Sequence, residues 1–290
     1  MLFQNFQNLD VWGALEMGLY FIIVGYFFLL FFYFLFIRFR TSKKSYWLFF
    51  SLFFLFFGIA RVFFIVYYFF APELYDEIAG NGVEVIAFLM VTYRFATFFT
   101  WLGNACAVGV LGILLFPPDT QVEKNEEKGF SLKNWFRNKN NIKLLLRIGL
   151  FVTPIIIGIL TLTLSQWLFM DPDFPSQYNE PSLYNNIELI RIGNWEYPIG
   201  RFLLNFIFMP LFLVLIPIMF IYLAMKTYGV LRKSYFLNAV GFVLYFVGGR
   251  ILQGAFDVLE YAHVRAIGPP LIILLALLIL VIANNYEQLR

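Results

Sequence analysis

Seven stretches of the chain are apolar over a length that can cross a bilayer, and this feature restricts the fold more than any other. An α-helix rises about 1.5 Å per residue, so roughly 20 apolar residues cross about 30 Å of hydrocarbon. Only 13% of the 290 residues are charged, against about 25% in soluble domains. The sequence therefore predicts an all-α, polytopic membrane bundle. The spans are expected near residues 13–37, 46–70, 84–116, 143–169, 201–225, 236–261 and 269–285.

The distribution of Lys and Arg predicts how this bundle is oriented. The connections after the first, third and fifth spans carry basic clusters at 38–44, 124–143 and 226–233. The alternate connections are mainly acidic. Cytoplasmic loops carry the excess of basic residues, so we expect an outside N-terminus, a cytoplasmic C-terminus and a location in the plasma membrane. Residues 1–290 are expected to form one transmembrane domain, with the lipid bilayer as its partner and no separate soluble domain.

Three arginines interrupt the apolar spans and mark a candidate site. Arg61 lies in the second span, Arg94 in the third and Arg250 in the sixth. A charge at bilayer depth costs at least about 2.5–3.5 kcal/mol, so such residues face the bundle interior, pair with another group or line water. We therefore expect all three to face the interior, near the middle or in the outer half.

Polar neighbours recur at helical spacing beside two of these arginines and extend the candidate site. Residues three and four positions apart share one face of a helix. In the sixth span this spacing joins Arg250 to a glutamine and two acids, and in the third it joins Arg94 to an aromatic and an amide. The predicted ligand-binding residues are Arg61, Arg94, Trp101, Asn104, Arg250, Gln253, Asp257 and Glu260.

Two interpretations of these residues remain open at this point. In the first, the arginines form buried ion pairs with Asp257, Glu260, Glu84 or Glu16 and hold the helices in register. In the second, they line an outward-facing polar cavity that binds a small polar or anionic ligand. The two interpretations are compatible with each other.

The longest external segment, residues 171–200, contains the sequence Ile187–Ile192, whose alternation favours a strand. Aromatic residues of this segment predict either a lid or a belt at the membrane interface. The belt is the more ordinary role of aromatics at that depth.

The residue types needed for several kinds of chemistry are missing, and we expect no enzyme. One histidine, His263, and one cysteine, Cys106, cannot form a multi-histidine metal site or an intrachain disulfide. The predicted last span, 269–285, contains no lysine, which excludes a retinal Schiff base there. We therefore expect no metal, no cofactor and no nucleic-acid partner.

The leading hypothesis is a receptor-like or sensory protein with seven spans and a cavity for an external ligand. The topology matches that of heptahelical receptors, but their inner acidic-Arg-Tyr and Asn-Pro-x-x-Tyr motifs are absent, and architecture alone does not carry function. An effector would contact loops 38–45, 117–142 and 226–235. The alternatives are a transporter or pore for a small solute or anion, and a structural subunit of a membrane complex.

Overall fold

The computed structural model describes residues 11–71, 81–116, 139–193, 195–252 and 262–285, and helices make up most of these ranges. In the first half of the chain, a π-helical segment joins the first helix to a short helical end. The elements are α1 (Val11–Phe32), η2 (Tyr33–Phe39), α2 (Arg40–Ser42), α3 (Ser45–Phe69), α5 (Gly82–Leu115) and α7 (Lys139–Thr163).

In the second half, small elements precede three further long helical runs. Two of these runs contain π-helical segments, which lie within otherwise continuous helix. The small elements are η3 (Gln166–Leu168), α8 (Phe174–Gln177), η4 (Pro181–Asn186), β1 (Leu189–Ile192) and β2 (Trp195–Pro198). The long runs are α9 (Ile199–Phe202), η5 (Leu203–Phe208) and α10 (Met209–Lys226), then α11 (Gly229–Phe246) and η6 (Val247–Leu252), then α13 (Ala262–Asn285).

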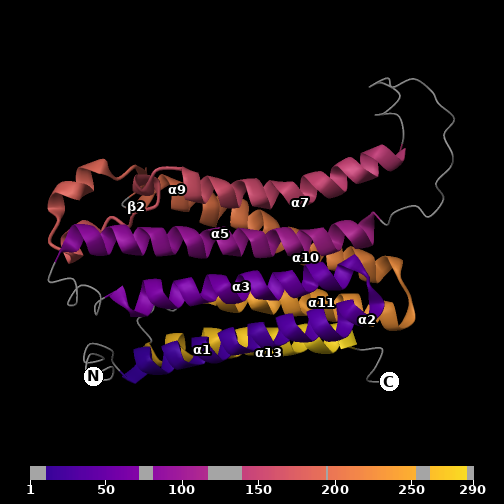
Figure 1. Cartoon of the computed structure of the whole chain (residues 1–290). Coiled ribbons are helices and arrows are strands. Elements are labelled where there is room, and N and C mark those ends of the chain that lie inside the picture. The colour runs from indigo at the N-terminus through magenta and orange to yellow at the C-terminus, as the bar shows by residue number, and fades with distance from the viewer. Residues whose placement is uncertain (1–10, 72–80, 117–138, 194, 253–261, 286–290) are drawn as a thin grey trace, which may run out of the picture.

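The long helices form two layers (Figure 1). In one layer α7, α5, α3 and α1 are successive neighbours. In the other layer α10, α11 and α13 are neighbours, and contacts of α1 with α13 and of α5 with α10 join the layers. We call the end that carries β1 and β2 the hairpin end, and the opposite end, where α13 finishes, the C-terminal end.

Six helical runs of the described residues are long and apolar enough to cross a membrane, so the predicted all-α membrane bundle is confirmed in this form. The predicted span at 236–261 overlaps α11 and η6, which pack against α10 and α13, and residues 253–261 of it lie outside the description. The count of seven and the orientation stay predictions. The six runs are Val11–Ser42, Ser45–Phe69, Gly82–Leu115, Asn141–Thr163, Ile199–Lys226 and Ala266–Asn285.

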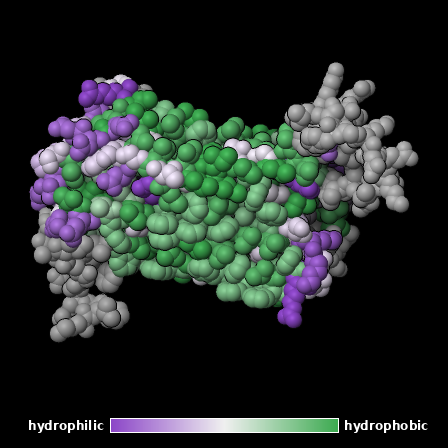
Figure 2. Space-filling model, turned by 45° about the horizontal axis from the view of Figure 1, so that its top comes forward, coloured by the Kyte–Doolittle hydropathy of each residue, from purple (hydrophilic) through white to green (hydrophobic). Residues whose placement is uncertain are grey.

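The outer surface of the bundle matches a hydrocarbon solvent. Figure 2 shows an apolar band between hydrophilic ends of the molecule. On α10, for example, Leu211, Val214 and Ile218 each leave half or more of their surface exposed. Contiguous apolar patches of this extent are rare on soluble monomers, whereas lipid tails cover them without cost.

A compact segment covers the hairpin end between α7 and α9. It contains the antiparallel pair β1–β2, in which Arg191 lies opposite Glu196. The strand predicted near Ile187–Ile192 is therefore present, beginning at Leu189. Gly82, at the start of α5, lies so close to the Tyr178 carbonyl that an added Cβ would be 2.2 Å from that oxygen. The segment thus packs directly against the tip of α5.

Candidate ligand-binding cavity

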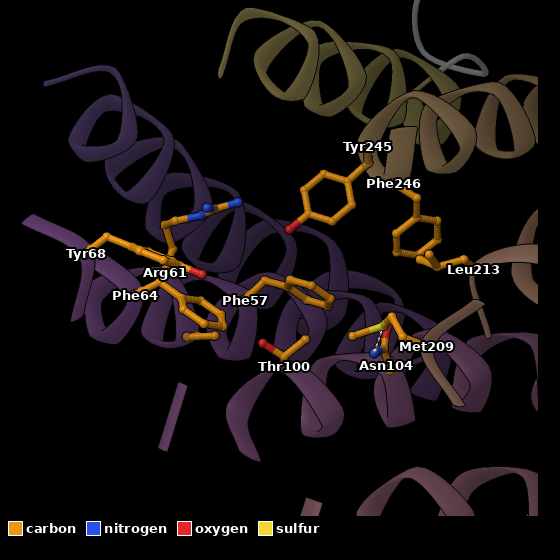
Figure 3. A pocket seen from close by; sticks show the side chains of 11 residues that line it. Phe57, Arg61, Phe64, Tyr68, Thr100, Asn104, Met209, Leu213, Tyr245 and Phe246 are labelled. Carbon is orange, nitrogen blue, oxygen red and sulfur yellow. Dashed lines mark hydrogen bonds between the residues drawn. The ribbon is translucent and has the colours of Figure 1, made fainter. Parts of the chain in front are cut away.

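A cavity lies between the two layers, enclosed by α3 and α5 on one side and by α10 and α11 on the other (Figure 3). The space open to the centres of water-sized molecules is about 60 Å³. This corresponds to roughly four to six waters at about 10–15 Å³ each. The lining residues are Phe57, Ala60, Arg61, Phe64, Tyr68, Thr100, Asn104, Met209, Leu213, Tyr245 and Phe246.

Arg61 is the charged residue among the described residues that line this cavity. It shares one face of α3 with Phe57 and Phe64, at positions four before and three after it. Its guanidinium carbon lies 4.5 Å from the ring centroid of Tyr20 on α1. That contact is a cation–π interaction, which satisfies none of the guanidinium's donors. Within the described part of the chain, no carboxylate or hydrogen-bond acceptor contacts Arg61.

Asn104 supplies a second unsatisfied group to the same cavity. Its side chain is completely buried, and its amide Nδ2 donates a weak hydrogen bond of 3.6 Å to Met209 Sδ. No described residue donates to its Oδ1. A buried acceptor without a donor costs about 1–3 kcal/mol, so this oxygen is suited to receive a hydrogen bond from a bound molecule.

Close packing of α3 against α5 fixes the depth of these two groups. A Cβ added at Gly103 would lie 2.4 Å from the Phe57 ring, so Asn104, the next residue, is at the level of Phe57. Arg61 follows Phe57 by four residues, which is about 6 Å along the helix. The guanidinium therefore comes from a level about one turn nearer the hairpin end than the amide.

Two π-helical segments adjoin the cavity. Segment η5 ends at Phe208, immediately before the lining residue Met209, and η6 begins at Val247, immediately after Phe246. A π-turn places an additional residue in a helix and locally disturbs its regular packing, and such turns are frequent at functional sites. The helical runs of α10 and α11, which enclose the cavity from the second layer, therefore both depart from regular α-geometry beside this space.

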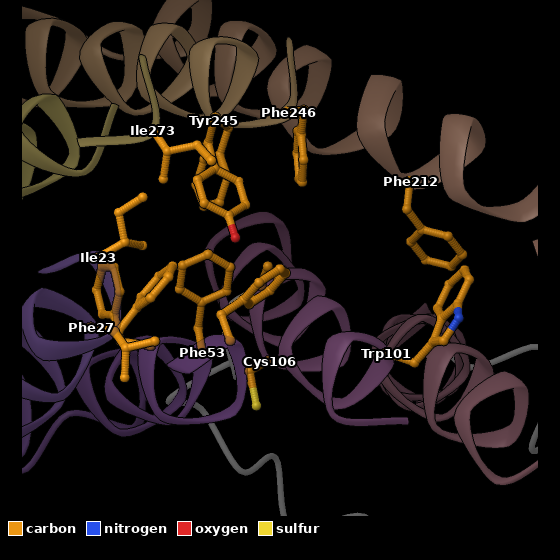
Figure 4. Close-up of a cluster of buried hydrophobic side chains, with 14 of the residues drawn as sticks. Ile23, Phe27, Phe53, Trp101, Cys106, Phe212, Tyr245, Phe246 and Ile273 are labelled. Carbon is orange, nitrogen blue, oxygen red and sulfur yellow. The ribbon is translucent and has the colours of Figure 1, made fainter. Parts of the chain in front are cut away.

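Buried aromatic side chains pack between the two layers, Phe53 among them (Figure 4), and they close the cavity toward the C-terminal end. Phe53 and Phe242 lie one helical turn nearer the C-terminal end than the lining residues Phe57 and Phe246. The ring centroids of Phe53 and Phe242 are 5.5 Å apart across the two layers. We call the group formed by Phe50, Phe53, Phe54 and Phe242 the aromatic plug. Each of its members is no more than 1% exposed. The cavity therefore ends blindly on this side.

Arg94, which the sequence analysis places in the site, lies elsewhere. Its guanidinium donates to the carbonyls at the end of α7: Nε to Thr161 at 2.8 Å, and Nη2 to Leu162 and to Leu164, the latter at 2.7 Å. The last four carbonyls of a helix have no partner within it. Arg94 thus caps α7 and is absent from the described lining of the cavity.

The other predicted residues divide between buried core and undescribed positions. Trp101 is completely buried and meets Phe212 edge to face at 5.5 Å, outside the described cavity lining. The backbone of Arg250 belongs to η6. Its side chain lies outside the description, as do Gln253, Asp257 and Glu260. The structure therefore brings Arg61 and Asn104 together and separates Arg94 and Trp101 from them.

No known protein family, curated protein or solved structure matches this chain.

A buried arginine at the hairpin end is missing from the predicted site residues. Arg201 is 8% exposed. It donates to the Phe169 carbonyl, to Tyr67 at 2.7 Å and to Asp171 at 3.2 Å. Its guanidinium carbon also lies 4.3 Å from the Tyr93 ring centroid. Each of these contacts engages the cation, so Arg201 is a structural anchor between the segment that covers the hairpin end and the helices.

A polar network at the C-terminal end is also absent from the sequence predictions. Asn284 donates from Nδ2 to Asn238 at 2.8 Å and accepts a 2.5 Å hydrogen bond from Tyr46. The neighbouring Asn285 accepts hydrogen bonds from Tyr33 and Arg38. These contacts join the end of α13 to η2, α3 and α11. The pair Asn284-Asn285 at the end of an apolar run is the signal that could have found them.

Proposed function

We propose that the chain is a seven-span, receptor-like membrane protein that binds a small polar or anionic ligand in the cavity beside Arg61. The observation that carries this proposal is the guanidinium of Arg61, which faces a mainly apolar cavity with no described anionic partner. Intramembrane ionisable groups mark functional sites by default. A bound anion would supply the partner that Arg61 lacks.

The contrast with Arg201 and Arg94 supports the same assignment. Arg201 is engaged by a carboxylate, a phenol and a carbonyl, and Arg94 by three carbonyls. These two arginines illustrate how the protein stabilises a guanidinium that has a structural role. Arg61 lacks comparable partners within the described residues, which favours an exchangeable partner.

The aromatic plug favours binding over conduction. A transporter or pore needs polar groups along the path of a charged solute, whereas the next layer toward the C-terminal end consists of buried phenylalanines. The transporter therefore remains the less supported alternative. For the orientation we rely on the basic residues of loops 38–44, 124–143 and 226–233, which favour a cytoplasmic C-terminal end.

Three variants of the purified full chain in detergent test the proposal. Arg61→Met removes the cation while keeping an apolar chain of similar length. We expect its melting temperature without ligand to equal or exceed that of the wild type, because an unpaired charge is removed. Arg61→Lys should also melt near the wild type. Arg201→Met is the matched control and should melt much lower.

The competing interpretation gives the opposite result. If Arg61 forms an essential ion pair, Arg61→Met leaves a buried carboxylate without its partner, which typically costs about 3–5 kcal/mol. A fall in melting temperature as large as that of Arg201→Met would therefore overturn the ligand-binding proposal.

A further inference from the structure

We infer that the ligand is a small amphipathic monocarboxylate with a hydroxyl group at its far end. Its carboxylate binds Arg61, its short apolar body lies against Phe57 and Phe246, and its hydroxyl donates a hydrogen bond to Asn104. This inference rests on the proposed binding function and specifies the chemistry of the molecule that enters the cavity.

The charge of the cavity selects a monoanion. Arg61 is the one charged residue among the described lining residues. A guanidinium is a donor-only group whose planar fork pairs with both oxygens of a carboxylate. A second negative charge on the ligand would be buried without a counter-ion, which is strongly unfavourable. A cationic ligand would be repelled by the arginine.

The walls between the polar groups select a short apolar body. Phe57, Ala60, Phe64, Leu213 and Phe246 contribute this part of the lining. Water requires about two to four polar partners to be held in a buried site, and these side chains provide none. A hydrocarbon segment is therefore the better occupant of this part of the cavity.

The end of the cavity beside Asn104 offers an unpaired hydrogen-bond acceptor. One N–H of the Asn104 Nδ2 group donates to Met209 Sδ, whereas Oδ1 is buried and has no donor among the described residues. The hydroxyl proton of Thr100 is donated to the Ala96 carbonyl at 2.8 Å, so its oxygen is likewise restricted to accepting. A ligand that presents an acceptor to Arg61 and a donor to Asn104 Oδ1 therefore satisfies both groups.

The size of the cavity limits the ligand to a few carbon atoms. Space for roughly four to six waters corresponds to about 120–180 Å³ of liquid, at about 30 Å³ per water. The polar groups come from helix levels about 6 Å apart. A four-carbon hydroxy acid, 4-hydroxybutanoate, has the required groups at its two ends and serves as the reference probe.

Three matched probes each lack one of these features. Butanoate lacks the hydroxyl donor, butane-1,4-diol lacks the charge, and succinate carries a second charge. We expect 4-hydroxybutanoate to raise the melting temperature of the purified full chain most and butanoate to raise it less. The diol and succinate should have little effect. Loss of one neutral hydrogen bond predicts about tenfold weaker binding of butanoate.

Two variants assign the ends of the ligand to their residues. Arg61→Met should abolish stabilisation by both monocarboxylates. Asn104→Leu, which keeps the branched shape of the side chain but removes the acceptor, should make 4-hydroxybutanoate and butanoate bind equally. It should leave the stabilisation by butanoate in place. If 4-hydroxybutanoate still stabilised Asn104→Leu more than butanoate does, the assignment of the ligand's hydroxyl to Asn104 would be overturned.

The outcomes distinguish failure of this inference from failure of the proposed binding function on which it rests. If succinate or the diol stabilises the protein as strongly as 4-hydroxybutanoate, the ligand class is wrong although the cavity binds a ligand. If none of the four probes stabilises the wild type while Arg61→Met melts like the wild type, the inference alone fails. A large fall in the melting temperature of Arg61→Met in the absence of probes overturns both this inference and the proposed function.

Discussion

The guanidinium Nη2 of Arg201 donates a 2.7 Å hydrogen bond to the hydroxyl of Tyr67, from a position 134 residues away in the sequence. The same guanidinium pairs with Asp171 in the segment that covers the hairpin end. One buried cation thus connects α9, α3 and the segment between α7 and β1.

Arg201→Met should lower the stability of the protein by about 3–5 kcal/mol, because it removes the centre of a buried charged network. Tyr67→Phe should cost about 1–3 kcal/mol, since it leaves one guanidinium donor without an acceptor. Arg191→Met is the control. Arg191 pairs with Glu196 at 2.8 Å, but its side chain is 74% exposed, and exposed pairs contribute about 0–1 kcal/mol. Equal melting temperatures for the Arg201 and Arg191 variants would contradict the anchor role.

Gly82→Ala should destabilise the contact between α5 and the segment that covers the hairpin end. Its added Cβ would lie 2.2 Å from the carbonyl oxygen of Tyr178, which is backbone and cannot rotate away. Overpacking of this kind costs about 1–3 kcal/mol. Gly18→Ala is a matched control, because no atom lies within 4 Å of its added Cβ. The melting temperature should fall for Gly82→Ala and stay level or rise slightly for Gly18→Ala.

Arg94→Leu should fray the last turn of α7. The substitution removes the donors that reach the carbonyls of Thr161, Leu162 and Leu164. A carbonyl that loses its donor away from water costs about 1–3 kcal/mol, and the contacts with Thr161 and Leu162 are partly buried. Faster hydrogen exchange in residues 158–164, with unchanged exchange in α3, would report the loss. Arg94→Lys retains the charge without the fork of donors and should give an intermediate rate. Unchanged exchange in both variants would show that water replaces the cap.

A double-mutant cycle should detect coupling across the C-terminal end. Tyr46 donates to Asn284 at 2.5 Å, and Asn284 in turn donates to Asn238. Groups in one hydrogen-bond network show interaction energies of about 0.5–3 kcal/mol. We expect Tyr46→Phe with Asn284→Ala to cost less than the sum of the two single substitutions in melting experiments. Additive losses would mean that the two side chains act independently.

The β-hairpin should lose local stability in acid. The pKa of Glu196 lies below its ordinary value, mainly because Tyr184 donates a hydrogen bond to its carboxylate and also because Arg191 pairs with it. A lowered pKa in the folded state stabilises the protein above the unfolded value of about 4.3. This stabilisation disappears as the pH falls through the lowered folded pKa.

Exchange protection of residues 189–198, corrected for intrinsic rates, should therefore decrease below about pH 4.3 in the wild type. The matched control is Glu196→Gln, which cannot titrate at this position and should show constant protection over the same interval. A parallel decrease in both proteins would assign the acid effect to another group.

The apolar stretches predict most helices because both features follow from one requirement. Backbone groups in hydrocarbon must be satisfied within the helix itself, so the length and composition of a stretch suffice to place it. The predicted second span, 46–70, corresponds closely to Ser45–Phe69. The predicted sixth span is less regular, because η6 interrupts the α-helical geometry at 247–252.

The partners of the arginines could not be read from the sequence in the same way. Helical spacing places Arg94 and Asn104 on related faces of one helix, but the side chain of Arg94 reaches the end of α7 instead of the cavity. Which of these two places the Arg94 side chain reaches depends on where α7 ends in space. Likewise Tyr46 and Asn284 meet across 238 positions, and only the packing of α3 near α13 brings them together.

The cap that Arg94 provides has a consequence for hydrophobic mismatch. Arg94 lies twelve residues beyond Gly82, so α7 finishes about 18 Å below the tip of α5. A helix that ends in lipid normally has to bring its terminal carbonyls to the headgroups, and changes of bilayer thickness then force it to tilt. At the end of α7, Arg94 of α5 donates to the carbonyls of Thr161, Leu162 and Leu164 in place of headgroup water. Its tilt is therefore set by α5, and membranes of different thickness should accommodate this helix alike.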